Sequence, residues 1–213
     1  MNMVNLGGDE WGTFEGAVST TQGARLGAVH TGGEGAVITL GEINDKCFTE
    51  PSSCKNSDSF SVTLWFRHRT TYLNHNNTVQ QTFLSIGDNE NIVFKIFRLA
   101  KQTEEHLAVE VAVSSRNCRY VFPVPKFLWS QFAFVWNTTD LNIYRDNVEV
   151  ENFFVTDCFA ITDFSPQRAV VILQGDATFD DLRIWSRTLE AKEIEEMFTC
   201  VRGMLNSLGG VLG

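Results

Sequence analysis

The stretch FDDLRIWSRTLEAKEIEEMF, residues 179–198, decides the fold, and the rest of the chain can be interpreted outward from it. Residues 179–185 alternate in character, with the period of two that is typical of a β-strand. One predicted side carries Phe179, Asp181, Arg183 and Trp185, and the other carries Asp180, Leu182 and Ile184. We therefore expect a buried strand close to the C-terminus.

The second half of this stretch changes to a helical period. Apolar residues recur near helical spacing at Leu189, Ile194, Met197 and Val201. The charged residues between them fall on the other faces of the predicted helix. Thr188 or Ser186 is expected to cap the helix, because a side-chain hydroxyl can accept a hydrogen bond from a backbone N–H of the first turn. The sequence thus predicts a short amphipathic helix directly after the strand.

Short strand-like segments, separated by turn signals, fill the rest of the chain. Ser59–Phe66 is the clearest of them, with one apolar side made of Phe60, Val62, Leu64 and Phe66. The other predicted strands are Ala17–Thr20, Ala28–His30, Ala36–Leu40, Thr82–Ile86, Ile92–Leu99, Leu107–Val113, Tyr120–Val124, Phe132–Trp136, Leu141–Arg145, Val148–Val155, Val170–Leu173 and Thr178–Trp185. Asp146-Asn147 is expected to form a hairpin turn, since both residues suit a positive φ. Many short strands without an earlier helical window indicate a two-sheet sandwich.

Several of these segments resemble, in the same order, laminin G-like and pentraxin-like domains. The likeness begins with the Gly-rich opening GTFEGAVSTTQGARLGAVHTGGEGAVITLGEI, residues 12–43, and continues with a Cys loop followed by SFSVTLWFR, residues 59–67. It then includes FLWSQFAFVWNTTDLNIYRDNVEV, residues 127–150, and ends with the closing motif at residues 177–198. The resemblance covers nearly the whole chain. It implies a concanavalin A-like jelly roll, an all-β fold of two antiparallel sheets with a short C-terminal helix.

The composition limits the number of domains and the kind of partner. With 213 residues, 43% of them apolar, the chain can bury one substantial core, so residues 1–213 are predicted to form a single domain. Residues 199–213 comprise the end of the helix and a Gly-rich tail. The net charge of −9 argues against nucleic acid as a partner, because that binding depends on neutralising phosphates. No apolar run approaches the ~20 residues of a membrane-spanning helix, so we expect no membrane insertion.

The five cysteines are an odd number, so at least one of them cannot pair within the chain. Cys47 and Cys54 flank a short loop, a spacing that closes easily into a disulfide ring. Cys118 opens a predicted strand and Cys158 follows one, whereas Cys200 lies in the helix beside the tail. We favour a Cys118–Cys158 pair with Cys200 unpaired or intermolecular. A bond from Cys200 to either of the other two is the alternative.

Two sequence signals indicate an extracellular location. Asn76 and Asn137 each begin an Asn-X-Thr acceptor for N-linked glycosylation, and both lie in turn-like places. Paired cysteines persist mainly in oxidising compartments. We therefore expect a secreted protein or the ectodomain of a membrane protein.

Residues that could carry catalysis do not come together in the sequence. Glu149 and Glu151 share one face of a predicted strand, as the carboxylates of glycan-cleaving jelly rolls do, but a solvated strand face explains them better. No Gly-X-Ser-X-Gly elbow is present, and the histidines are scattered at His30, His68, His75 and His106. We predict that the chain is not an enzyme.

The resemblance makes calcium the candidate cofactor. Calcium prefers several carboxylate or carbonyl oxygens that converge from loops, and in some related domains the first acidic residue of the closing strand takes part. Asp180 matches that residue, and Asp9 could supply a second oxygen. The alternative is that Asp180 bonds backbone amides where the terminal strands meet. Of the multi-acid calcium loop of pentraxins, only Asp157 and Asp163 are present in the corresponding region.

Two tryptophans fall on an unexpected side of their strands. Trp65 and Trp185 each lie opposite the main apolar set. An outward Trp can stack on a sugar or anchor a protein partner. It can also pack under the C-terminal helix, which is the role we expect for Trp185.

These inferences favour a non-enzymatic recognition or adhesion module that binds a protein or glycan partner through the surface of the sandwich. Such a module would belong to a larger secreted or cell-surface protein. The first alternative is a calcium-dependent carbohydrate-binding lectin, which needs an outward aromatic platform and the metal. The second is a structural subunit that self-associates through sheet edges or through Cys200.

A calcium site at Asp180 has a direct thermal test. A metal that binds only the folded state stabilises it by mass action, so millimolar calcium should raise the melting temperature above its value in chelator. Scanning calorimetry measures the shift. Equal melting temperatures in calcium and in chelator would contradict a calcium site at Asp180.

Overall fold

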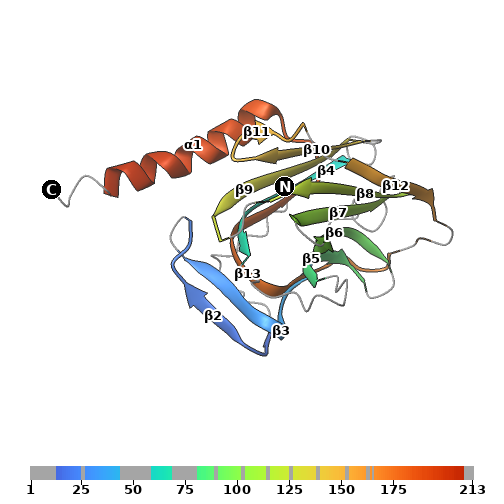
Figure 1. Cartoon of the computed structure of the whole chain (residues 1–213), viewed down its shortest axis with the longest axis horizontal. Helices are drawn as coiled ribbons and strands as arrows, with labels where there is room; N and C mark the ends of the chain where they lie inside the picture. Colours follow the sequence, from blue (N-terminus) through green and yellow to red (C-terminus); the bar gives the residue numbers. More distant parts are fainter. Residues whose placement is uncertain are drawn as a thin grey trace.

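The structure is a computed structural model, which describes residues 13–24, 27–43, 59–68, 81–88, 91–101, 104–113, 116–124, 127–137, 140–151, 154–161, 164 and 166–208. Almost every element in these residues is a β-strand (Figure 1). The elements are β1 Thr13–Glu15, β2 Val18–Thr21, β3 Ala28–Glu42, β4 Ser59–His68, β5 Gln81–Gly87, β6 Ile92–Lys101, β7 Glu104–Val113, β8 Arg116–Pro123, β9 Ser130–Asn137, β10 Asp140–Arg145, β11 Val148–Glu149, β12 Phe154–Ala160, β13 Val170–Trp185 and α1 Ala191–Leu208.

The strands form one continuous antiparallel ladder that is folded into two layers. The order is β11-β10-β9-β4-β13-β5-β6-β7-β8-β12, with β3 beside β13 and with β1 and β2 beside β3. The first part of β13, Val170–Leu173, pairs with β5, and the second part, Ala177–Trp185, pairs with β4. Figure 1 shows the strands curving around a shared interior, with α1 on one side. The predicted all-β jelly roll with a C-terminal helix is confirmed.

Strand β13 passes from one layer to the other at Gly175. This residue has a φ of +82°, and an added Cβ would lie 2.9 Å from both a Phe83 ring carbon and the Thr82 carbonyl oxygen. Only glycine combines this φ with so little space. The ladder between β13 and β3 shifts register at the same point, so the two neighbouring strands bend together.

A bulge in β13 overturns the strict alternation predicted for the closing motif. Phe179, Leu182 and Ile184 are all buried in the main core, although the alternation placed Phe179 opposite the other two. Asp181 has a φ of +48°, and the register with β4 shifts beside it. A bulge adds one residue to a strand and thereby reverses the phase of the side chains that follow. The Asp181 carboxylate accepts two hydrogen bonds from the Arg183 guanidinium, at 2.8 Å and 3.0 Å, across this bulge.

The predicted strand Val148–Val155 is wrong. β11 ends at Glu149 and pairs with β10, whereas β12 begins at Phe154 and pairs with β8, at the opposite end of the strand order. The chain therefore crosses between the layers inside the predicted segment. Val148 belongs to β11, whereas Phe154 and Val155 belong to β12.

Other predicted elements are confirmed or extended. The hairpin turn is confirmed, because Asp146 and Asn147 have φ values of 52° and 66° between β10 and β11. Segments that were predicted as separate strands on either side of residues 31–35 and 174–177 are joined into β3 and β13. Bends at glycine-containing bulges, rather than turns, lie where the breaks were expected.

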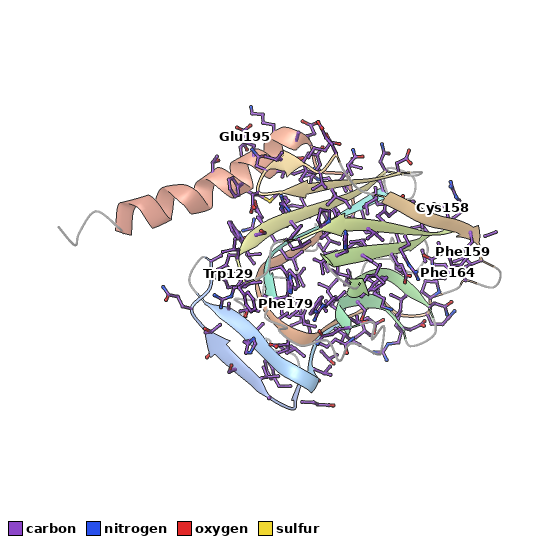
Figure 2. The ribbon with its side chains drawn as sticks, in the orientation of Figure 1. Trp129, Cys158, Phe159, Phe164, Phe179 and Glu195 are labelled. Carbon is purple, nitrogen blue, oxygen red and sulfur yellow. A yellow bond between two sulfur atoms is a disulfide. The ribbon has the colours of Figure 1, made fainter. Side chains whose placement is uncertain are left out.

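Aromatic side chains from both layers fill the interior. The apolar side predicted for β4 is confirmed, since Phe60, Val62, Leu64 and Phe66 are each no more than 2% exposed. The rings of Phe94 on β6 and Phe134 on β9 lie 5.5 Å apart and so connect the layers. Phe179 lies in the same interior (Figure 2), with its ring 5.5 Å from that of Phe66.

The connection from β13 to α1 is fixed by a buried serine of β4. Ser61 Oγ donates a hydrogen bond of 2.9 Å to the Arg187 carbonyl and accepts one of 3.0 Å from the Leu189 N–H. The expected caps Thr188 and Ser186 are wrong, because α1 begins only at Ala191.

A glutamate from inside the helix takes the capping role instead. Glu193 Oε2 accepts a hydrogen bond of 2.9 Å from the Glu190 N–H, just before the helix begins. The same carboxylate accepts hydrogen bonds of 2.8 Å and 2.6 Å from the Arg187 guanidinium. These bonds, with Arg187 first, lower the pKa of Glu193 from 4.5 to about 2. The ion pair joins the helix start to the end of β13.

Replacing Leu64 by alanine should destabilise the fold strongly. Leu64 is 1% exposed in the middle of β4, so truncation leaves a cavity that costs about 2–5 kcal/mol of unfolding free energy. Urea denaturation measures this loss. Leu128→Ala is the control, because Leu128 is 62% exposed and its truncation should change stability little. A loss for Leu64→Ala as small as that for Leu128→Ala would contradict the position of Leu64 in the core.

The Arg187–Glu193 ion pair predicts a particular pH dependence of stability. Because the pKa of Glu193 in the fold, about 2, lies below its ordinary value of 4.5, its carboxylate stabilises the fold above about pH 4.5. That contribution is lost as the pH falls toward 2. The wild type should therefore be more stable than Glu193→Gln above about pH 4.5, and this difference in unfolding free energy should disappear as the pH falls toward 2. Urea denaturation at several pH values measures it.

The matched control for this measurement is Glu196→Gln. The Glu196 side chain is 68% exposed and its carboxylate lies 3.9 Å from the Lys192 ammonium, so its removal should have a smaller effect at every pH. A Glu193→Gln difference that does not change with pH would contradict the role given to the ion pair.

Candidate functional site

The first part of α1 covers the outer face of the β4–β9 layer. Ile194 of the helix is buried with Ala133 and Val135 of β9, and Trp185 and Met197 pack against them. The expectation that Trp185 packs under the C-terminal helix is therefore confirmed. The helix removes this part of the sheet from the surface that a partner could reach.

A second outer cluster surrounds Trp65. This residue is 8% exposed and packs with Ala24, Trp129 and Phe198. The Phe198 ring stacks on the Trp65 indole, with centroids 5.9 Å apart and an angle of 16° between the planes. Trp65 does point outward, as its phase predicted, but the helix covers the ring face that a sugar would need.

Two large apolar side chains lie exposed beside this cluster, in the loop that leads into β9. Phe127 is 49% exposed and Leu128 is 62% exposed. Phe127 has a φ of +60°, which is an unusual conformation for a bulky residue, and its N–H donates a hydrogen bond of 3.2 Å to the His68 carbonyl. The end of β4 thus holds the loop in a defined conformation with its apolar side chains in solvent.

The base of this loop is an aromatic–cation contact. The Arg67 guanidinium lies over the Trp129 ring, 4.8 Å from its centroid. We call Arg67, Phe127, Leu128 and Trp129 the loop site. Arginine and aromatic residues contribute most of the binding energy in many protein interfaces.

None of the site residues predicted from the sequence belongs to the loop site. Phe127, Leu128 and Trp129 form an uninterrupted apolar run directly before the alternating strand β9. Such a run breaks the period of two that is typical of a strand. This break was the only sign in the sequence that these apolar side chains do not all face the core. Figure 2 shows Trp129 on the opposite side of the sandwich from Phe159, which is another exposed aromatic residue.

Asp180, the candidate calcium ligand, lies in a confined position at the β13 bulge. It is 6% exposed, and an added Cβ on Gly23 would lie 2.3 Å from its Oδ2 atom. The carboxylate therefore packs directly against the backbone of the N-terminal segment. Among the described residues, no group of three or more His, Cys, Asp or Glu side chains could hold a metal ion. Asp9 lies outside those residues. Asp180 supplies one carboxylate, which fits the structural alternative as well as a calcium site.

The predicted bond between Cys118 and Cys158 is present. The two residues are directly paired across β8 and β12, with Cα atoms 4.1 Å apart. Cys200 lies within α1, as expected. Because Cys118 and Cys158 are bonded to each other, the alternative in which Cys200 bonds one of them is wrong. Cys47 and Cys54 lie outside the described residues.

The remaining predicted residues take no part in the loop site. Asn137 is exposed at the end of β9, and Asn76 lies outside the described residues. Glu149 is exposed on β11, and Glu151 is exposed beyond the end of that strand. The two glutamates therefore do not form the paired strand face that was considered for glycan cleavage.

The described elements define a class of protein, a two-layer β-sandwich with an exposed apolar loop at one end. The family comparison makes this specific, because residues 40–195 match the model of the concanavalin A-like lectin/glucanases superfamily. The match covers more than half of the chain, so the chain belongs to this superfamily. The laminin G-like resemblance seen in the sequence is confirmed. None of the curated protein sequences is a significant match.

Similar solved structures are binding domains of botulinum neurotoxins. That of serotype G has a TM-score of 0.64 and 14% identity over 91% of this chain and 47% of its own. The DC binding domain in complex with rat synaptotagmin II has a TM-score of 0.59 and 13% identity, over 89% and 46%. A type C structure, described by the dependence of cell entry on two ganglioside molecules, has a TM-score of 0.59 and 13% identity, over 89% and 46%.

These structural similarities concern the fold alone. The identities are 13–14%, and the chain spans less than half the length of each neurotoxin domain. No helix in the described part of the chain is long and apolar enough to cross a membrane.

Proposed function

We propose that this chain is a non-enzymatic, extracellular recognition module that binds a protein or glycan partner through the loop site. The observation that carries the proposal is the pair of large apolar side chains, Phe127 and Leu128, held in solvent by a loop that is bonded to β4. A preorganised loop loses little conformational entropy on binding, so its apolar contacts contribute more fully to affinity. Trp129 and Arg67 lie on the same surface, and tryptophan and arginine are enriched among the residues that contribute most to binding energy in protein interfaces.

Three further observations support a binding role. The chain belongs to a superfamily named for both lectins and glucanases, so its fold is compatible with glycan recognition. The similar neurotoxin domains are described with a protein and with gangliosides. The Cys118–Cys158 disulfide favours an oxidising compartment, in agreement with the two glycosylation acceptors.

The loop site favours binding over hydrolysis. Its side chains offer apolar contact and one cation, whereas glycan cleavage needs two carboxylates that face a common cleft. The calcium-dependent lectin is the alternative, and the comparison of melting temperatures in calcium and in chelator tests it.

Substituting the two exposed residues should abolish recognition without unfolding the chain. A labelled tetramer of the chain is applied to cultured cells, and its binding is compared with that of the double variant Phe127→Asn, Leu128→Ser. Asparagine tolerates the positive φ of position 127, so the loop conformation is retained. Loss of two central apolar anchors should weaken binding at least about tenfold.

The matched control for this test is Phe159→Ser. Phe159 is also 49% exposed but lies on the opposite side of the sandwich from Trp129 (Figure 2), so its substitution should leave binding unchanged. Pretreating the cells with trypsin or with glycosidases distinguishes a protein partner from a glycan partner. Equal binding by the wild type and the double variant would contradict the proposal.

A further inference from the structure

Two buried polar atoms on the outer face of the β4–β9 layer make no hydrogen bond. Trp65 is 8% exposed and Gln131 is 5% exposed, and the two residues lie directly opposite each other on β4 and β9. Since opposite residues of an antiparallel pair share one face, Gln131 lies on the outer face with Trp65. Neither the Trp65 Nε1 donor nor the Gln131 Oε1 acceptor has a hydrogen-bond partner in the part of the chain that the structure describes. Burying an unpaired donor and an unpaired acceptor is costly.

The side chain that covers the Trp65 ring is apolar. Phe198 of α1 belongs to the same cluster, and its ring stacks on the indole with centroids 5.9 Å apart. A phenyl ring carries no hydrogen-bonding side-chain atom, so it covers the indole without satisfying the indole N–H or the Gln131 amide oxygen. The covered state therefore has the apolar contact but lacks two hydrogen bonds.

The start of α1 is anchored independently of Phe198. Ile194 is 1% exposed against β9, and the ion pair between Arg187 and Glu193 fixes the helix to the end of β13. Phe198 itself is only partly buried. Figure 1 shows the C-terminal part of α1 extending away from the sandwich. The contact at Phe198 can therefore open locally while the start of the helix stays in place.

We propose that Phe198 is a displaceable cover over a saccharide subsite, which consists of the Trp65 ring, the Trp65 indole N–H and the Gln131 amide oxygen. A pyranose has an apolar C–H face, which can replace the Phe198 ring on the electron-rich face of the indole. Its hydroxyl groups both donate and accept hydrogen bonds, so they can pair the two polar atoms beside that ring.

The unpaired atoms favour a sugar over a protein side chain as the occupant. An apolar side chain of a protein partner would leave the Trp65 N–H and the Gln131 oxygen unpaired, as Phe198 already does. A polyhydroxylated ring satisfies both atoms and keeps the contact with the indole. The proposal stands on this covered cluster and does not depend on the loop site.

Exchange of the indole N–H protons with solvent tests whether the cover opens. Trp136 is the internal reference, because its Nε1 atom also lacks a hydrogen-bond partner among the described residues but lies in the main core, in a residue that is 2% exposed. The Trp136 proton should exchange only on global unfolding, whereas the Trp65 proton should exchange at least about tenfold faster through the local opening. NMR of the indole N–H groups measures both rates, with Trp65→Phe and Trp136→Phe assigning the signals. Equal rates would overturn the proposal.

Binding to an array of defined oligosaccharides tests the ligand. Phe198→Ala removes the cover and retains a residue that favours a helix. Its affinity should exceed that of the wild type at least about tenfold, because the wild type must first displace Phe198. Adding Trp65→Phe or Gln131→Met removes one polar atom, keeps an apolar side chain in its place, and should reverse this gain.

Glu195→Ala is the matched control, since Glu195 is exposed on the same helix (Figure 2) and its substitution should leave binding as in the wild type. Phe198→Gln, which also removes the ring, repeats the test if Phe198→Ala does not fold. No binding by either uncovered variant, or equal binding by the wild type, would overturn the proposal. So would binding that does not change with Trp65→Phe and Gln131→Met. Cell binding that requires Trp65 but survives glycosidase treatment would identify a protein partner and also overturn it.

Discussion

The backbone pairing of β13 is the constraint on which the rest of the structure depends. This strand bonds β3 along most of its length and bonds β5 with one part and β4 with the other. A strand that serves both layers must bend without losing hydrogen bonds, because an unpaired buried amide or carbonyl is costly. Gly175 provides the bend, and the bulge at Asp181 resets the phase so that Phe179, Leu182 and Ile184 all reach the interior.

The position of the loop site follows from this pairing. β13 places β4, and β4 in turn pairs with β9, so the start of β9 meets the end of β4. The Phe127 N–H can then bond the His68 carbonyl, and Arg67 can lie over Trp129. The chain that leaves β13 becomes α1, which covers Trp65 and Trp185 but leaves the loop in solvent. The outer face thus has a part that the helix covers and a part that remains accessible.

Much of the fold could be predicted from the sequence, since a period of two identifies the strands and their apolar sides. The inward face of β4, the hairpin at Asp146 and the helix over Trp185 follow from such local patterns. The bulge could not be predicted, because a positive φ at Asp181 leaves no mark in a pattern of apolar and polar residues. The segment from residue 148 to 155 was misassigned for a related reason: its apolar residues belong to strands in different layers. The loop site depends on a contact between the end of β4 and the loop before β9, which are distant in sequence. Only the apolar run of residues 127–129 could therefore be recognised in the sequence.

Hydrogen exchange along β13 tests most directly whether this strand unites the two layers. If it does, the amides of both its parts, at Val171–Leu173 and at Phe179–Ile184, should be among the slowest to exchange. Both parts should open with the free energy of global unfolding, because neither layer can separate while the strand remains paired. If one part exchanged through a lower-energy local opening while the other stayed protected, the two layers would be independent units. The bend at Gly175 would then be a hinge between them and not the link that holds them together.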